Sequence, residues 1–231
     1  MFLGHFGVAL AAKKAAPKVS LGTLVFAAQF ADLLWPLLLL AGFEQVNIMP
    51  GLLAASPFDF TSYPISHSLV AQLGWGVILG VVYLFVKRDG RTALLIGALV
   101  PTHWVLDFIA HRPDMPIYPG GAKYGLGMWN SLPLTMIVEY VVFAAGIALY
   151  LGVTRARDRT GNLALWSLLG LLAVLYVASE FGPPPPSVKI LAESALAIWL
   201  TVPWAAWADR HREPRMTEIE VTSRGRAGHS D

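Results

Sequence analysis

The sequence predicts an all-α membrane protein, a bundle of six transmembrane helices preceded by an N-terminal half-helix. Of its 231 residues, 55% are hydrophobic and only 14% are charged, whereas soluble domains carry about 25% charged residues. The apolar residues fall in long blocks, and about 20 apolar residues suffice to cross the hydrocarbon core as a helix. Most Lys and Arg residues lie in alternate connections between these blocks. Together these observations exclude an ordinary soluble domain.

The first apolar segment, residues 2–12, is too short to cross a membrane. A helix of this length extends about 16 Å, roughly half of the hydrocarbon core. Its positive charges follow the apolar residues, at Lys13, Lys14 and Lys18, which is the reverse of a signal peptide. Two interpretations stay open. A half-helix entering from the cytoplasmic side would bury His5, whereas a helix lying flat on the surface would leave His5 in water.

Six longer apolar segments follow, and each predicts one transmembrane helix. We expect the first of them to kink at Trp35–Pro36, because proline interrupts helical hydrogen bonding. They form a single transmembrane domain over residues 1–208. Residues 209–231 are polar without apolar periodicity, which predicts a disordered cytoplasmic tail. The predicted spans cover residues 21–42, 64–86, 92–110, 132–151, 163–181 and 188–208.

Charge placement orients the predicted bundle. With the N-terminus in the cytoplasm, 14 Lys and Arg residues fall in cytoplasmic segments and three fall outside, at Arg112, Lys123 and Lys189, which accounts for all 17. An excess of Lys and Arg is typical of cytoplasmic connections. We therefore expect both termini in the cytoplasm.

One stretch at the end of the third predicted span concentrates residues that bind metals. His103, Asp107 and His111 are spaced four apart, which places them on one face of a helix. A His and a carboxylate one turn apart can bind the same ion. For any one of them alone, a polar contact at a helix interface is the simpler alternative.

Three further ionisable residues, His5, Asp32 and His67, lie in or beside apolar segments. Such side chains are costly in the hydrocarbon core unless they meet partners or water. Counting about 1.5 Å per residue places them, with His103 and Asp107, in the outer half or centre of the bilayer. We predict that these five residues form a metal site in a funnel open to the outside. The alternative is a proton-relay or polar-packing cluster without metal.

The predicted ligands indicate the kind of metal. Three His and two Asp suit one or two zinc ions, with manganese or iron as alternatives. The chain has no Cys, which excludes thiolate ligands and disulfides. A carboxylate that does not bind the metal, Asp107 or Asp32, could act as general base. Spare candidates for ligands are His111, Asp114 and Glu139.

The loop of residues 111–130 is rich in Pro and Gly. Loops of this length are often functional, and an ordered cap over the bundle is the alternative. Arg112 and Lys123 could hold a phosphate or another anionic head group. His111 and Asp114 are further candidates for contact with a substrate.

The order of these residues carries a resemblance. His5, Asp32, Ser66-His67-Ser68 and His103-x-x-x-Asp107 resemble the bacterial inner-membrane family described as metal-dependent hydrolases, also called LexA-binding after one member. The resemblance covers about residues 1–151. That family is in turn similar to the zinc-dependent phospholipase C and single-strand nuclease group. The resemblance implies a location in the bacterial inner membrane and a role for the matched His and Asp residues as zinc ligands.

The sequence departs from the soluble enzymes of that group, which have a later His-x-x-x-Glu pair and further His ligands. The chain contains no His-x-x-x-Glu, and no His lies between His111 and His211. One or two metal ions are therefore expected rather than three. Nothing in the sequence supports a cytoplasmic LexA partner.

Three functions compete at this point. The first is a membrane-embedded metal-dependent hydrolase that acts on a phosphoester or lipid from the extracytoplasmic side, with an amphiphilic or anionic small molecule as substrate. The second is a transporter or permease that uses the same polar cluster as an ion or proton path. The third is a non-catalytic membrane scaffold. Nucleic-acid binding is not expected, because topology already explains the basic residues.

Overall fold

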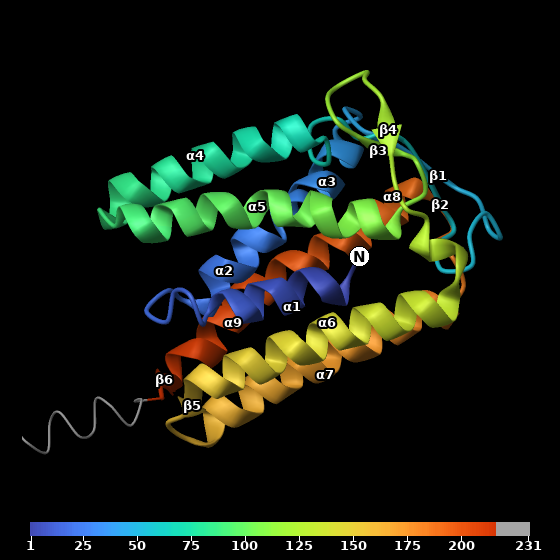
Figure 1. The fold of residues 1–231 in the computed structure, drawn as a ribbon. Helices are drawn as coiled ribbons and strands as arrows, with labels where there is room; N and C mark the ends of the chain where they lie inside the picture. Colours follow the sequence, from blue (N-terminus) through green and yellow to red (C-terminus); the bar gives the residue numbers. More distant parts are fainter. Residues whose placement is uncertain (216–231) are drawn as a thin grey trace, which may run out of the picture.

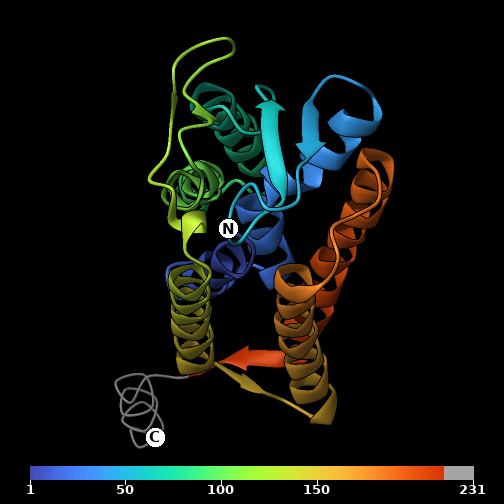
Figure 2. The same cartoon turned by 90° about the vertical axis from the view of Figure 1, so that its right-hand side faces the viewer.

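The computed structural model describes residues 1–215, and these residues form a mostly helical molecule. In Figure 1, α4 and α5 lie on one side of the molecule and α6 and α7 on the other, with α1, α2 and α9 between them, and Figure 2 shows that α6 and α7 stand apart. Helix α4 packs on α5, α6 packs on α1, and α7 packs on α9. The helices are α1 (Leu3–Ala12), α2 (Leu21–Ala28), α3 (Phe30–Leu40), α4 (Leu69–Lys87), α5 (Gly90–Ala110), α6 (Leu132–Val153), α7 (Arg159–Phe181), α8 (Val188–Ala195) and α9 (Thr201–Arg210).

The prediction of several apolar helices is confirmed. Within residues 1–215, five helical segments are long and apolar enough to cross a membrane, and α2 and α3 make a sixth if they count as one bent span. The last of the five, Val188–Arg210, joins α8 and α9 through a 3₁₀ segment, Leu196–Leu200. The long helices expose large apolar side chains on their outer faces, among them Val77, Phe85, Leu94, Ile137 and Val174. Outward apolar faces of this extent indicate a membrane protein.

The first predicted span bends at Gln29, before the kink expected at Trp35–Pro36. Helices α2 and α3 meet there at 56°, whereas α3 runs through Pro36. The carbonyl oxygen of Ala28 accepts a hydrogen bond from His103 Nδ1 at 3.0 Å. This oxygen would accept the Asp32 N–H in an unbroken helix. A side chain from α5 thus competes with the helical hydrogen bond at the point of the bend.

Helix α1 is buried in the middle of the molecule, where Figure 1 marks the N-terminus. Glycines let it cross α6 at close range: a Cβ atom at Gly146 would lie 2.2 Å from the Gly7 carbonyl oxygen. Its residues Leu3, Phe6, Ala9 and Leu10 belong to the main hydrophobic core, together with residues of α2, α5, α6, α7 and α9. Burial of His5 in this position agrees with a half-helix inside the bundle and not with a helix lying flat in water.

Short antiparallel strands gather at the two ends of the bundle (Figures 1 and 2). At one end, β1 (Gln45–Ile48) pairs with β2 (Phe58–Ser62) and β3 (Met115–Pro116) pairs with β4 (Lys123–Tyr124). At the other end, β5 (Thr154–Ala156) pairs with β6 (Arg212–Pro214). A 3₁₀ turn, Met128–Asn130, leads into α6.

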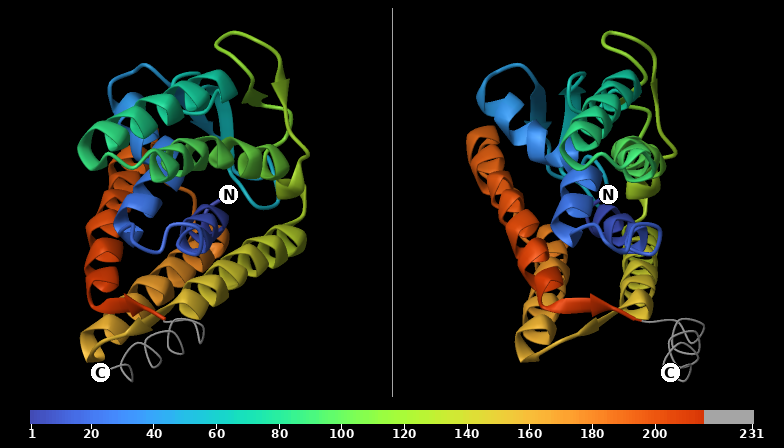
Figure 3. Two further views of the ribbon diagram at one scale, coloured as in Figure 1. Left: turned by 60° about the vertical axis from the view of Figure 1, so that its left-hand side comes forward. Right: turned by 90° about the vertical axis from the view of Figure 1, so that its left-hand side faces the viewer.

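The structured part of the chain continues beyond the predicted boundary at residue 208. Helix α9 ends at Arg210 and β6 follows it, as the two views of Figure 3 show. The side chain of Asp209 explains the extension, because its carboxylate accepts hydrogen bonds from Lys13 Nζ, the Leu21 N–H and Tyr150 Oη. The rest of the predicted tail, residues 216–231, lies outside the described residues.

Candidate metal centre

The centre of the site is the His103–Asp107 pair on α5. The two residues are one helical turn apart, and His103 Nε2 lies 3.1 Å from Asp107 Oδ2. Both side chains are buried. The helix presents them on the face that packs on α2, α1 and α3, so one element sets their spacing, as the sequence predicts.

Three other segments bring the remaining predicted residues to this pair. His5 comes from α1, and its Nε2 lies 3.1 Å from Asp107 Oδ1. Asp32 comes from the first turn of α3, and its Oδ1 lies 3.6 Å from His103 Nε2. His67 comes from the turn before α4, and its Nε2 lies 3.5 Å from Asp32 Oδ1 and 3.8 Å from Asp107 Oδ2.

These separations match those between ligands of one metal ion. Ligand atoms bonded at 2.0–2.2 Å to a tetrahedral zinc ion lie about 3.3–3.6 Å apart. Two sets of three residues have their ligand atoms all within 4.8 Å of one another, and both sets include His103. They are His5 with His103 and Asp107, and Asp32 with His67 and His103. These buried groups could hold a metal ion.

Hydrogen bonding determines which nitrogen of His103 is free to bind a metal. Its Nδ1 faces the carbonyl oxygen of Ala28, which can only accept, so Nδ1 carries the proton in the neutral ring. Nε2 then presents a lone pair toward the oxygens of Asp32 and Asp107. It is buried and has no hydrogen-bond partner among residues 1–215. An acceptor facing two carboxylates is unfavourable unless a cation lies between them.

Protonating every histidine does not resolve this arrangement. The rings of His5 and His103 are stacked with their centroids 3.6 Å apart and their planes 3° from parallel. Two buried imidazolium ions at that distance would repel each other strongly. A divalent cation would compensate both carboxylates while the rings stay neutral, which is the state in which imidazole binds metals. The alternative without metal is one protonated histidine, His103, whose Nε2–H would donate to the carboxylates. Imidazole nitrogens and carboxylate oxygens are donors that divalent metal ions accept.

Glu139, a spare candidate for a ligand, has a different contact. Its carboxylate accepts the N–H groups of Phe2 and Gly4 at 2.8 and 2.7 Å. The first N–H groups of a helix have no partner within the helix, so Glu139 caps α1. The amino group of Met1, beside this cap, contacts Asp107. By capping α1, Glu139 fixes the position of this helix relative to α6, and this position brings His5 to the site.

His111 and Asp114, the other spare candidates, form a separate pair beside the site. His111 Nδ1 lies 3.0 Å from Asp114 Oδ1, and Tyr63 donates its hydroxyl to the same carboxylate and to the Asp114 carbonyl. Burial lowers the pKa of His111 and raises the pKa of Tyr63. Neither His111 nor Asp114 belongs to the two sets with ligand spacing.

The basic residues proposed for head-group binding are both engaged with the protein. Arg112 forms ion pairs with Asp59 of β2 and with Asp114. Lys123 donates from Nζ to the Thr61 carbonyl at 2.9 Å. These bonds tie the loop of residues 111–130 to the β1–β2 hairpin. An anion would have to compete with Asp59 and Asp114 for Arg112.

The predicted funnel to the outside is filled by aromatic side chains. The ring of Phe60, on β2, contacts Tyr63, His111 and Trp129 with centroids 4.9–6.1 Å apart. This packing closes the hairpin and the loop over the site. Asp32 is the exception: its side chain is 26% exposed, whereas those of His5, His67, His103 and Asp107 are at most 6% exposed. Access to the five residues therefore runs past Asp32.

Four contributors to the site were not predicted from the sequence. They are Glu44, the hydroxyl of Ser66 as a partner of His67, the carbonyl of Ala28 and the amino group of Met1. Glu44 stands in a polar segment that has no metal-binding spacing, so nothing in its surroundings marks it. A backbone carbonyl gives no sequence signal of any kind. For Ser66, the one signal in the sequence is its position directly before His67.

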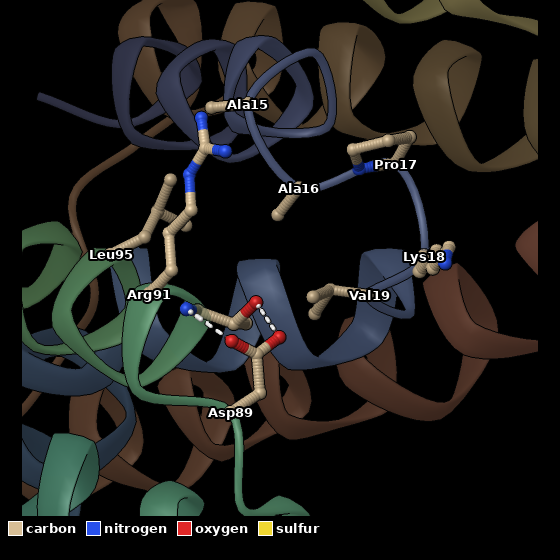
Figure 4. A pocket seen from close by; sticks show the side chains of 9 residues that line it. Ala15, Ala16, Pro17, Lys18, Val19, Asp89, Arg91 and Leu95 are labelled. Carbon is tan, nitrogen blue, oxygen red and sulfur yellow. Dashed lines mark hydrogen bonds between the residues drawn. The ribbon is translucent and has the colours of Figure 1, made fainter.

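Two surface hollows lie at the opposite end of the molecule from this site. One, of about 310 Å³, is lined by Ala15 to Val19 and by Asp89, Arg91, Thr92 and Leu95, and Figure 4 shows Arg91 reaching across it toward Ala15. The other, of about 270 Å³, includes Lys13, Lys18 and Arg212 in its lining. They show that basic connections predicted to share one side of the membrane also lie together in space.

In comparisons with known proteins, no protein family, curated protein or solved structure matches this chain.

Proposed function

We propose that this protein is a membrane-embedded metal-dependent hydrolase with six spans, cytoplasmic termini and a site that works from the extracytoplasmic half of the bundle. The observation that carries the proposal is the convergence of three imidazole Nε2 atoms on two carboxylates within a buried space. The bent pair α2–α3 supplies the sixth span of this proposal. The resemblance to the inner-membrane hydrolase family supports the same function.

Three of the five residues would hold one zinc ion. Asp32, His67 and His103 have ligand atoms that all lie within 4.8 Å of one another, and catalytic zinc sites take three protein ligands and a water. Asp107 Oδ1 faces His5, and these two residues would hold a second ion.

The chemistry assigned to the centre is hydrolysis. A bound zinc ion lowers the pKa of a coordinated water and polarises the bond under attack. Asp107, at the centre of the cluster, orients the ligands around it. Asp32 is the carboxylate nearest to the access route and the one we assign to proton transfer with the incoming substrate and water. Both are the catalytic candidates expected from the sequence.

Buried polar groups near the centre support a polar ligand there. Gln29, at the bend before α3, has neither amide atom bonded within residues 1–215, and Trp35 Nε1 and Gln72 Nε2 are likewise unbonded. Gln72 accepts the Trp104 N–H on α5 with its other amide atom. Buried donors without partners are rare in folded proteins. Water or the oxygen atoms of a substrate would satisfy them.

The position of Asp32 favours an amphiphilic substrate. Helix α3, which carries Asp32, also exposes Leu37 and Leu40. A substrate that reaches Asp32 along this helix meets apolar side chains before it meets the carboxylates. A lipid or lipid-linked phosphoester combines an apolar chain with a polar group in this order.

Metal analysis of the purified protein, with parallel assays of phosphoester and lipid hydrolysis, tests the proposal. Wild type should contain one or two zinc ions per chain, and His103→Ala should lose metal and activity together. His211→Ala is the matched control, because His211 pairs with Asp158 at the other end of the molecule. Full hydrolysis by metal-free protein would contradict the proposal, and ion flux in liposomes that depends on His103 would favour the transporter.

A further inference from the structure

A chain of hydrogen bonds leads from a buried carboxylate to His67. Glu44 lies between α3 and β1, and Ser66 directly precedes His67 in the turn before α4. Glu44 and Ser66 are both buried. Ser66 Oγ lies 2.5 Å from Glu44 Oε2 and 2.6 Å from His67 Nδ1. The three side chains thus form one continuous line that ends at the imidazole ring.

The other carboxylate oxygen of Glu44 fixes this line to the backbone. Its Oε1 accepts the N–H groups of Ile65 and Ser66, each at 2.8 Å. Glu44 therefore holds the whole turn that carries His67 as well as the Ser66 hydroxyl. Burial makes the arrangement rigid, because water cannot replace any of these bonds without entering the core.

The order of donors along the line decides the tautomer of His67. A carboxylate only accepts hydrogen bonds, and a serine hydroxyl has a single proton to donate. With that proton directed to Glu44, Ser66 Oγ can only accept from His67, so Nδ1 carries the proton. The Nε2 lone pair then points to Asp32 and Asp107, as metal binding requires.

We infer that Glu44 is a positioning residue which, through Ser66, holds His67 in the tautomer that binds metal at Nε2. The inference rests on the proposed function, because it assigns an outer partner to one ligand of that centre. Metal-binding histidines usually donate their second nitrogen to a carboxylate or a carbonyl. His103 uses the Ala28 carbonyl for this purpose, and His67 uses a carboxylate with a hydroxyl between.

Glu44→Gln tests the inference with almost no change of shape. A glutamine can keep its oxygen on the two N–H groups and turn its NH₂ group to Ser66. The Ser66 proton would then point to His67 Nδ1, and the ring proton would move to Nε2. We expect zinc affinity, measured by competition with a chelator, to fall by about 10- to 100-fold. Ser66→Ala should reduce it similarly, because the line to Glu44 is cut.

Ser68→Ala provides the matched control. Ser68 is also buried in this turn, but its hydroxyl donates to the Pro64 carbonyl and caps the N–H of Ala71. This variant should melt at a lower temperature and keep the zinc affinity of wild type. If Ser68→Ala weakens zinc binding as much as Ser66→Ala does, the effect belongs to the turn as a whole and the inference is wrong.

A spectroscopic measurement on the wild type tests the inference without any variant. In ¹⁵N-histidine-labelled, zinc-loaded protein, His67 should show a protonated Nδ1 and a metal-bound Nε2. Zinc on Nδ1 would overturn the inference, as would a Glu44→Gln protein that binds zinc as wild type does. If wild type binds no zinc at all, the proposed function fails, and an Nε2-protonated His67 in that protein would refute the inference separately.

Discussion

Asp107, which is buried, and Asp209, whose side chain is 10% exposed, lie at opposite ends of the molecule and differ in what surrounds them. Asp209 accepts from three donors that need an acceptor: Lys13 Nζ at 2.6 Å, Tyr150 Oη at 2.7 Å and the Leu21 N–H at 3.1 Å. Asp107 Oδ1 pairs with the Met1 amino group and with His5, whereas its Oδ2 faces the Nε2 atoms of His67 and His103. Every group around Asp209 is a donor, whereas the imidazole nitrogens facing Asp107 Oδ2 are acceptors when the rings are protonated at Nδ1.

The difference separates a structural cluster from a functional one. Around Asp209, each donor meets an acceptor, so the cluster stabilises the packing of α1, α2, α6 and α9 without any ligand. At Asp107 Oδ2 and Asp32 Oδ1, acceptors face the neutral imidazole nitrogens, which a folded protein tolerates when a cation or a proton completes the site. The same residue type thus indicates two different roles through the chemistry of its neighbours.

The largest expected effect on folding is at Asp209. Asp209→Ala would leave Lys13 buried without its counter-charge, and removing one partner of a buried ion pair costs about 3–5 kcal/mol. Thermal unfolding followed by circular dichroism in detergent should show a large loss of stability, while the folded fraction keeps its metal. The matched control is Asp158→Ala, whose exposed pair with His211 is worth at most about 1 kcal/mol. Loss of metal without loss of stability would reverse the comparison.

Asp107→Asn should have the opposite profile. It removes one charge of the site but keeps an oxygen that can still accept from the Met1 amino group, so the metal-free protein should lose less stability than Asp209→Ala does. Metal content should fall at least tenfold and hydrolysis should fall steeply, because a ligand of the proposed centre is lost. Metal analysis and unfolding in the presence of a chelator measure the two quantities on one sample. A destabilisation as large as that of Asp209→Ala would make Asp107 a structural residue.

The smallest effect concerns pH and the cover over the site. Burial lowers the pKa of His111, against the opposing effect of Asp114. As the pH falls, His111 therefore takes up a proton in the unfolded chain at a higher pH than in the folded one. The contribution of neutral His111 to the free energy of unfolding is complete above about pH 6.5 and is lost as the pH falls below that value. His111→Gln should flatten the decrease in melting temperature between pH 7 and pH 5. An unchanged slope would show that His111 does not carry this dependence.

Local periodicity explains why the centre could be expected at all. His103 and Asp107 share a helix, and a spacing of four residues sets their relative position wherever that helix lies. His5, Asp32 and His67 were expected beside them because ionisable side chains in apolar segments need partners. That argument identifies which residues need polar or charged partners. It cannot predict which nitrogen of His67 faces which oxygen of Asp32.

The tertiary contacts decided what surrounds these residues. At the bend beside Gln29, the Ala28 carbonyl at the end of α2 accepts a hydrogen bond from His103 on α5. The cap on α1 depends on Glu139, which lies more than 130 residues along the chain. Aromatic packing of Phe60 on Trp129 closed the expected funnel. Each contact joins segments far apart in sequence, and none has a periodic signal.

The sequence by itself therefore determined the helical membrane class, the approximate spans and the residues that had to be compensated, because hydropathy and helical periodicity are properties of short stretches of chain. The structure alone decided where α1 lies, which groups surround Asp107 and Asp209, and which nitrogen of His67 and of His103 faces the carboxylates. These features depend on which group donates and which accepts in single hydrogen bonds between distant segments. Donor and acceptor are brought together only when those segments pack against each other.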